Sequence, residues 1–138
     1  MAIRVYIHGM IPQPGVAIFL EQKLYDTNLR YAMVTNDAAR LPNGELSRVS
    51  LLKAGVHLVK IFSPEHGIHV QGEDGKFQPS GIDPATHLPV ISLYGNVLMP
   101  TAKDLEDVDV VLFDIPDIGC RFYTYLWIAI ILCLPAFL

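Results

Sequence analysis

The stretch Lys60-Ile61-Phe62-Ser63-Pro64-Glu65-His66-Gly67 indicates both the fold class and the place of a candidate site. An apolar run from Val56 to Phe62 ends at a Ser-Pro pair, and a carboxylate, an imidazole and a glycine follow it. Because proline has no amide hydrogen and favours an extended residue before it, this pattern is typical of a buried strand that ends at Ser63. Ligands bind at the carboxyl ends of the strands in open parallel sheets. We therefore expect Glu65 and His66 in a functional loop.

Three further apolar runs also end in polar residues. They are 30–35, which runs into Asn36 and Asp37; 89–93, which ends at Tyr94; and 108–113, which is followed by Asp114, Asp117 and Arg121. Helical patterns lie between the runs, so the sequence predicts an α/β fold, a Rossmann-like parallel sheet with flanking helices. Parallel strands end at one shared edge, and we expect a single polar cleft there.

The helices are predicted from apolar spacing and from end signals. One is expected from Val16 to about Asp26, and a second presents Leu46, Val49 and Leu52 on one face and closes at Gly55. Thr101-x-x-Asp104 is typical of a capping box that opens a short helix. The segment 67–88 is polar and rich in glycine and proline, which predicts a long loop.

Composition narrows the class of protein. The chain has 138 residues, of which 51% are hydrophobic and 17% charged, so we expect one folded domain. The net charge is −4 and lysine and arginine do not cluster, so nucleic acid is not an expected partner. The two cysteines, Cys120 and Cys133, show neither a disulfide framework nor a metal-ligand spacing. Glu65, His66 and His69 do not follow the H-E-x-x-H order, so no metal is expected.

The two ends of the chain carry few signals. The first 14 residues lack a continuous apolar core, so we expect no export signal, and the compartment stays open. Residues 122–138 carry no charge and stand at the lower limit of a membrane span. Pro135 interrupts this segment, and the sequence leaves open whether it contacts a membrane.

Several strings together resemble the bacterial exo-β-N-acetylmuramidase family, also called NamZ-type or glycoside hydrolase family 171. The strings are Val34-Thr35-Asn36, Phe62-Ser63-Pro64-Glu65-His66-Gly67, Leu88-Pro89-Val90-Ile91-Ser92-Leu93-Tyr94-Gly95, Pro100-Thr101 and the segment 107–125. The resemblance covers about residues 15–125. It implies a Rossmann-like amino-terminal domain with the catalytic cleft, followed in the family by a second domain. It also implies release of terminal N-acetylmuramic acid from peptidoglycan fragments, and family members are often exported.

Compared with the family, this chain is short. We expect a partial Rossmann-like domain over residues 1–125 and an apolar tail over 126–138, as in a truncated or frame-shifted product. The expected partner is a muropeptide or muramyl saccharide, with no cofactor, and activity is expected to be impaired without the second domain. The alternative is a non-catalytic remnant or a fragment that binds a muramyl ligand. A dinucleotide-binding domain is a weaker rival, because no G-x-G-x-x-G follows the first strand.

The resemblance implies that Glu65 is the catalytic residue, and a glycosidase needs a proton donor and usually a second carboxylate. The alternative is that Glu65 is a solvated loop residue without a catalytic role, paired with Lys60 or Arg121. His66 either orients Glu65 or contacts substrate, or it is a structural histidine. Asp114 and Asp117 are the candidates for the second carboxylate, although Asp114 can instead hold Arg121 or cap the next helix.

The remaining candidate residues would bind substrate. Arg121 suits an anion such as the lactyl carboxylate of muramic acid. Asn36 offers an amide, and Tyr94 and Tyr123 offer rings and hydroxyls for sugar contacts, whereas aromatics beside strand ends are commonly only packing residues.

Overall fold

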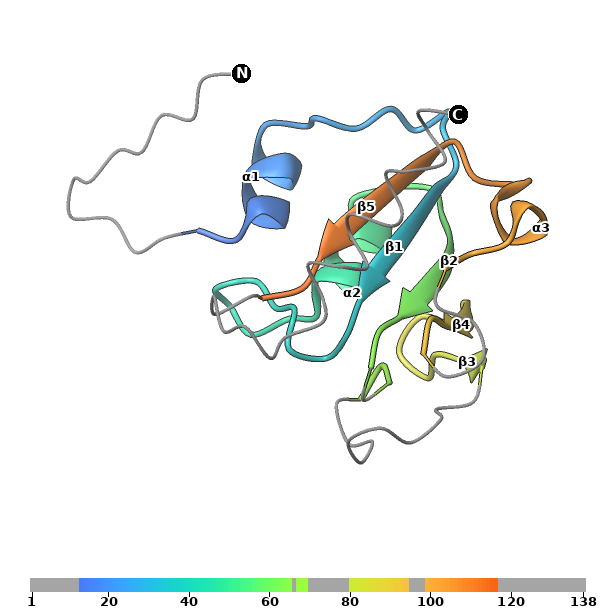
Figure 1. Cartoon of the computed structure of the whole chain (residues 1–138). Coiled ribbons are helices and arrows are strands. Elements are labelled where there is room, and N and C mark those ends of the chain that lie inside the picture. The colour runs from blue at the N-terminus through green and yellow to red at the C-terminus, as the bar shows by residue number, and fades with distance from the viewer. Residues whose placement is uncertain (1–12, 66, 70–79, 95–98, 117–138) are drawn as a thin grey trace, which may run out of the picture.

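A computed structural model of the chain describes residues 13–65, 67–69, 80–94 and 99–116, and the described strands form one sheet in the order β3-β4-β2-β1-β5 (Figure 1). The strands are β1 (Tyr31–Thr35), β2 (Leu58–Ser63), β3 (Gly81–Ile82), β4 (Pro89–Ser92) and β5 (Val110–Asp114). Strands β4, β2, β1 and β5 are parallel, and β3 pairs antiparallel with β4 at one edge. The predicted α/β class with a parallel sheet is confirmed.

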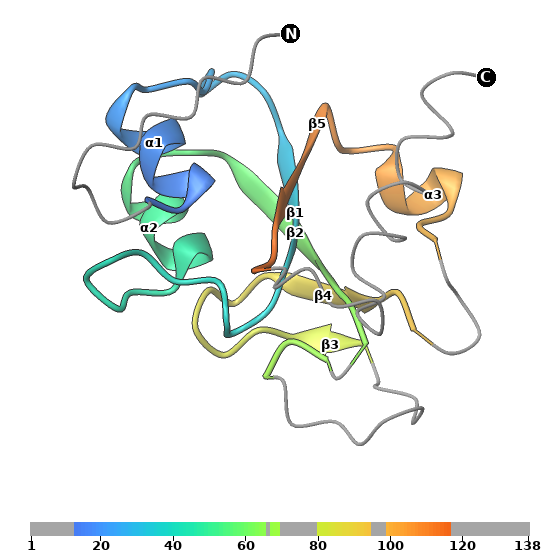
Figure 2. The same cartoon turned by 60° about the vertical axis from the view of Figure 1, so that its left-hand side comes forward.

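The described helices lie on both faces of the sheet. Helices α1 (Gly15–Glu21) and α2 (Ser47–Lys53) cover one face, and α3 (Ala102–Leu105) lies on the other (Figure 2). The predicted capping box opens α3, where the Asp104 N–H donates to Thr101 Oγ1 at 3.2 Å and the Thr101 N–H donates to Asp104 Oδ2 at 2.8 Å. Helix α1 ends earlier than predicted, because Lys23 takes a positive φ of 51° and breaks the helical path.

Strand β1 carries core residues on both of its faces, as expected for a central parallel strand. Tyr31 and Met33 pack with residues of α1 and α2, whereas Ala32 and Val34 pack with Phe62 and with hydrophobic side chains on the α3 side. All five residues of β1 are buried, because strands flank it on both sides and helices lie above and below. The two layers together form the described core.

Two expectations differ from the structure. The predicted loop 67–88 contains β3. This strand has two residues, too few to show the apolar and polar alternation by which a strand is predicted. The predicted apolar face of α2, Leu46, Val49 and Leu52, is not its most buried side. The buried residues of α2 are Ser47, Arg48, Ser50 and Leu51. Helix α2 turns its polar side inward because the buried Asp83 and the partly exposed Asp37 hold Arg48.

Strand β5 is the other edge of the described sheet, and its side chains alternate in exposure. Val111 and Phe113 are 37% and 39% exposed, whereas Val110 and Leu112 pack against the α1 and α2 side. No helix among the described residues is long and apolar enough to cross a membrane. The apolar tail 126–138 and Cys120 lie outside the described residues.

Gly55 ends α2 with a positive φ of 86°, and a Cβ added there would meet no atom within 4 Å. Because a side chain in the left-handed region is strained even where space is open, Gly55→Ala should lower the free energy of unfolding by about 1 kcal/mol. Urea denaturation measures this change. Gly15→Ala is the control, since its Cβ also meets nothing within 4 Å and its backbone is helical. An equal loss in both variants would contradict this explanation.

Candidate functional site

Polar side chains end the four parallel strands at one edge of the sheet. Thr35 pairs in register with Asp114, and Ser63 pairs with Ser92. Val34 of β1 pairs with Phe62 of β2, so Thr35 and Ser63 follow at the same level. Thr35, Ser63 and Ser92 are buried. The carboxyl edge therefore begins with a row of four small polar or acidic residues.

Glu65 lies just beyond β2, in a turn that the Gly67 N–H closes by donating to the Pro64 carbonyl at 3.1 Å. Gly67 has a φ of 72°, which favours glycine at this position. The sequence offered Lys60 as an alternative partner for Glu65. In the structure the Lys60 ammonium donates to the Asp104 carbonyl at 2.8 Å and pairs with the Asp107 carboxylate. The structure thus places Glu65 at the carboxyl edge, where the sequence predicted it.

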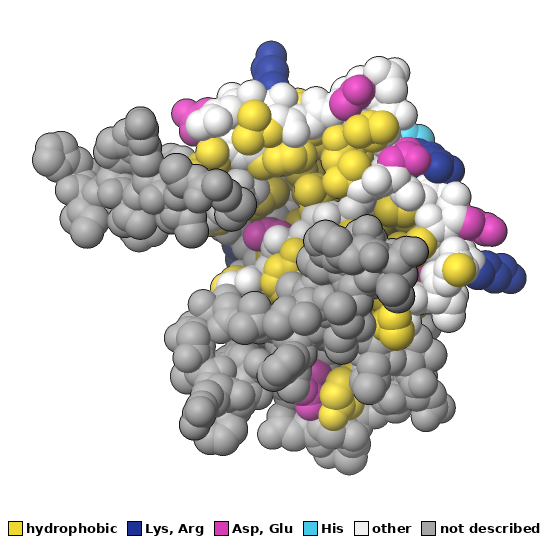
Figure 3. All heavy atoms as spheres, turned by 45° about the horizontal axis from the view of Figure 1, so that its top comes forward, with side chains coloured by type: hydrophobic (Ala, Val, Ile, Leu, Met, Phe, Trp, Pro, Cys, Tyr) yellow, Lys and Arg dark blue, Asp and Glu magenta, His cyan; other side chains and the backbone are white. Residues whose placement is uncertain are grey.

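Asp114 ends β5 and lines two adjoining cavities of about 240 Å³ and 480 Å³. Both cavities are also lined by Gly15 and Ile115, so they meet between the start of α1 and the end of β5. Figure 3 shows hydrophobic side chains gathered on this face of the molecule, with acidic side chains among and around them. Small ligands bind at the carboxyl ends of the strands in open parallel sheets, which is where these two hollows lie.

Burial raises the pKa of the Asp114 carboxyl, and the nearby Ser47 hydroxyl only partly opposes this. Asp114 Oδ2 and Ser47 Oγ are both buried and have no hydrogen-bond partner within the described part of the chain. We infer that the hydroxyl lies near the carboxyl without the geometry of a full hydrogen bond. Burial thus makes ionisation of this carboxyl harder than that of a solvated aspartate.

Glu65 lies two residues beyond β2 and Asp114 is the last residue of β5, and these two strands flank β1 on either side. Neighbouring strands lie about 4.8 Å apart, so the backbone ends of β2 and β5 are about 10 Å apart. The two carboxyls therefore belong to one edge, and their shared role in catalysis stays a prediction.

Of the other predicted site residues, Asn36 and Tyr94 lie in the described part of the chain. Asn36 is buried, and its Oδ1 accepts from the Ala38 N–H at 3.0 Å, so its side chain supports the turn after β1. Tyr94 lies two residues beyond the end of β4. The remaining four candidates lie outside the described residues: His66, Asp117, Arg121 and Tyr123.

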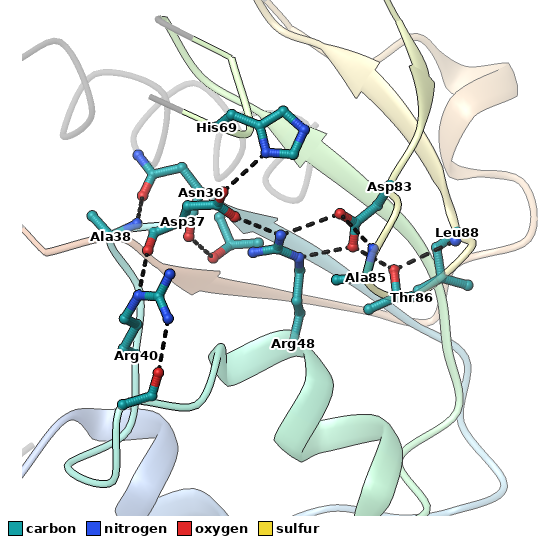
Figure 4. A network of polar contacts seen from close by, with 12 residues as sticks. Asn36, Asp37, Ala38, Arg40, Arg48, His69, Asp83, Ala85, Thr86 and Leu88 are labelled. Carbon is teal, nitrogen blue, oxygen red and sulfur yellow. Dashed lines mark hydrogen bonds and ion pairs between the residues drawn. The ribbon is translucent and has the colours of Figure 1, made fainter. Parts of the chain in front are cut away.

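A buried ion-pair network that the sequence reading missed joins this edge to α2 (Figure 4). Arg48 Nε donates to Asp83 Oδ2 at 2.8 Å, and Arg48 Nη2 donates to Asp37 Oδ1 at 2.5 Å. The side chains of Arg48 and Asp83 are 1% and 0% exposed. His69 Nδ1 lies 2.9 Å from Asp37 Oδ2, which extends the network to the loop that carries Glu65.

The network keeps its two carboxylates charged. Burial alone would raise the pKa of Asp37, but hydrogen bonds from His69 and Arg48 outweigh it and lower that pKa. Burial likewise opposes ionisation of Asp83, and hydrogen bonds from Arg48 and Thr86 lower its pKa. The pKa of Arg48 is raised, because its bonds to the carboxylates outweigh the burial that would lower it. The only feature of the sequence that pointed to this network was an arginine in the first turn of a helix. An arginine in that position is usually solvated, so the network was not predicted.

Asp83→Ala should lower the free energy of unfolding by about 3 kcal/mol or more, because it leaves the buried Arg48 cation without its two-point partner. Chemical denaturation at pH 7 measures the loss. The control is Asp109→Ala, which breaks the exposed pair that Asp109 forms with Arg30 at 2.8 Å and should cost far less. Equal losses in the two variants would show that the buried network is not a main source of stability.

Asp114→Asn should stabilise the fold at neutral pH. The raised pKa means that ionising Asp114 costs more in the folded chain than in the unfolded chain, whose carboxyl titrates near 3.8. The gain should appear as pH rises from about 3.8 through the folded pKa, and it should vanish at lower pH. Thermal midpoints measured from pH 3 to 8 check this. Asp107→Asn is the opposite control, because its pKa is lowered, first by the hydrogen bond from Lys60.

Comparisons with known proteins identify the family and the fold of the chain. A family model described as exo-beta-N-acetylmuramidase NamZ, N-terminal, matches residues 31–136. The chain is 39% identical over 100 residues to the peptidoglycan beta-N-acetylmuramidase NamZ of Bacillus subtilis (strain 168), a match that covers 71% of this chain and 24% of that protein.

Crystal structures of two DUF1343 family proteins from Bacteroides fragilis NCTC 9343 share the fold. Their TM-scores are 0.76 and 0.63 at 33% and 30% sequence identity, over 90% and 84% of this chain and 31% and 30% of theirs. The chain thus spans about a quarter of the length of the curated relative. With this match over most of its length, the chain belongs to the NamZ family of exo-β-N-acetylmuramidases, whose amino-terminal domain it resembles.

Proposed function

We propose that the chain acts on the muramyl end of peptidoglycan fragments and releases terminal N-acetylmuramic acid by hydrolysis of the glycosidic bond. Membership of the NamZ family is the observation that carries this proposal. The carboxyl edge of the sheet supports it, since Glu65 and Asp114 follow strands that end there. The activity belongs to a relative of which this chain spans 24%, so for this chain it is a proposal.

In this proposal, Glu65 protonates the leaving glycosidic oxygen and a second carboxyl group assists. Asp114 is the described candidate for the second group, because it ends β5 at the carboxyl edge and lines two cavities there. Asp117 is the alternative, and His66 orients Glu65. Most glycosidases divide the work between two acidic groups in this way.

Substrate binding is assigned to groups around the same edge. Asn36 and Tyr94 lie at the ends of β1 and β4, and Arg121 and Tyr123 follow β5 in the sequence. In this proposal the arginine pairs with the lactyl carboxylate and the tyrosines contact sugar faces. The partner is thus a muropeptide or a muramyl saccharide, with no cofactor.

Glu65→Gln should reduce release of chromophore from a chromogenic N-acetylmuramide by about 10²-fold or more, since general acid catalysis contributes at least that much. Absorbance at saturating substrate measures the rate. Glu106→Gln is the matched control, because Glu106 follows α3 and lies away from the carboxyl edge. Equal release by wild type and Glu65→Gln would refute catalysis through this residue.

A second candidate function is a fragment that binds a muramyl ligand without cleaving it. The match covers 24% of the relative whose name states the activity, so binding and cleavage by this chain are tested separately. Titration of the chain with N-acetylmuramic acid separates the two functions. Binding without release of chromophore would support the fragment.

A further inference from the structure

One side of strand β5 presents exposed hydrophobic side chains. Val111 and Phe113 are 37% and 39% exposed. In the parallel pairing of β5 with β1, Val111 lies opposite Ala32 and Phe113 lies opposite Val34, so these four side chains point to the same side of the sheet. Ala32 and Val34 belong to the core on the α3 side. The exposed face of β5 is therefore an extension of that core to the edge of the sheet.

The described helices cover the two sides of β5 unequally. On the α1 and α2 side, Val110 and Leu112 of β5 pack against the core. On the other side, α3 has four residues and ends at Leu105, before β5 begins at Val110 (Figure 2). Parallel sheets are covered on both faces, because their strands are apolar on both sides. The α3 side of β5 therefore has room for a further apolar segment.

The apolar tail 126–138 has the composition that this face requires. Every residue of the tail except Pro135 is hydrophobic, and none is charged. Contact between such a segment and water is unfavourable, because the hydrophobic effect favours burial of apolar surface. A helix on a protein surface would show a polar stripe, and the tail has none. The tail thus needs an apolar surface on which to pack.

The tail is also within reach of this face. The last described residue is Pro116, which closely follows the end of β5 at Asp114. An extended residue spans up to about 3.5 Å, so residues 117–125 are long enough for the chain to turn back. A strand of five residues is about 17 Å long, and about 11 helical residues span that length. The tail is therefore long enough to run the length of β5.

We propose that the apolar tail 126–138 packs on the exposed face of β5, over Val111 and Phe113, and completes the α3 side of the sheet. The covalent link favours this occupant over a second copy of the chain, because a segment on a short linker meets its site at a millimolar effective concentration. Phe113 also lines the smaller hollow beside Asp114, so the packed tail borders the candidate site. The inference does not depend on the proposed function.

The test uses Trp127, which lies in the tail and is the single tryptophan of the chain. In the 138-residue chain its fluorescence should be that of a buried indole, with emission at short wavelength and weak quenching by acrylamide. Phe113→Asp places a charge on the face, so the emission should shift to longer wavelength and the quenching should increase. Val111→Asp should have the same effect, and circular dichroism checks that each variant is folded.

Ile18→Asp is the matched control. Ile18 is also 39% exposed, and it lies in α1 on the other side of the sheet. This variant adds the same charge as Phe113→Asp at a site of equal exposure, so the emission and the quenching of Trp127 should stay as in wild type. A shift of equal size in Ile18→Asp and Phe113→Asp would contradict packing of the tail on β5.

A second measurement does not rely on changes to the face. Cys133 lies in the tail and is the single cysteine of a Cys120→Ser variant. A nitroxide attached to Cys133 should broaden the NMR methyl resonances of Val111 more than those of Val56, which is buried on the α1 and α2 side. Equal broadening of the two valines would overturn the inference.

The remaining outcomes assign the tail to another partner. Long-wavelength emission from folded wild type would overturn the inference, and a return to short wavelength on addition of phosphatidylcholine and phosphatidylglycerol vesicles would assign the tail to a membrane. Short-wavelength emission that is lost on dilution, together with dimers in sedimentation, would assign it to a second copy and also overturn the inference. None of these results bears on hydrolysis of a muramide, which the Glu65→Gln comparison tests separately.

Discussion

The buried guanidinium of Arg48 is the constraint on which the candidate site depends. It binds two carboxylates, Asp37 after β1 and Asp83 before β4, so a single side chain of α2 joins segments that are distant in the sequence. A charge in this position is stable only with matched partners, because desolvation of an unpaired ion costs several kcal/mol. The pairing therefore ties the loop after β1 and the segment before β4 to α2, and it explains why α2 turns polar residues inward.

The sheet was predictable because its signals are local. Each parallel strand is an apolar run that stops at a turn or at a proline, and Ser63-Pro64 is the clearest of these stops. Parallel pairing followed from the helical patterns between the runs, and it brought Glu65 and Asp114 to one edge as predicted. The capping box at Thr101 was predictable for the same reason, since its partners are three residues apart.

The polar network was not predictable, because its partners are far apart along the chain. Arg48 and Asp83 are 35 residues apart, and nothing near either residue indicates the other. The apolar spacing of α2 pointed to Leu52, whereas the ion pairs decided which side faces inward. His69 was considered only as a metal ligand, and its contact with Asp37 requires the fold to be known. The two-residue strand β3 was missed because it is too short to have a pattern.

The main-chain bond between Asp37 and Ile68 links the loops after β1 and β2 without using side-chain atoms. It adds to the side-chain contacts that Asp37 makes with Arg48 and His69. A substitution elsewhere on these loops that spares the Asp37 contacts therefore leaves both links in place. What the loops recognise can change in this way while the backbone that carries them is kept.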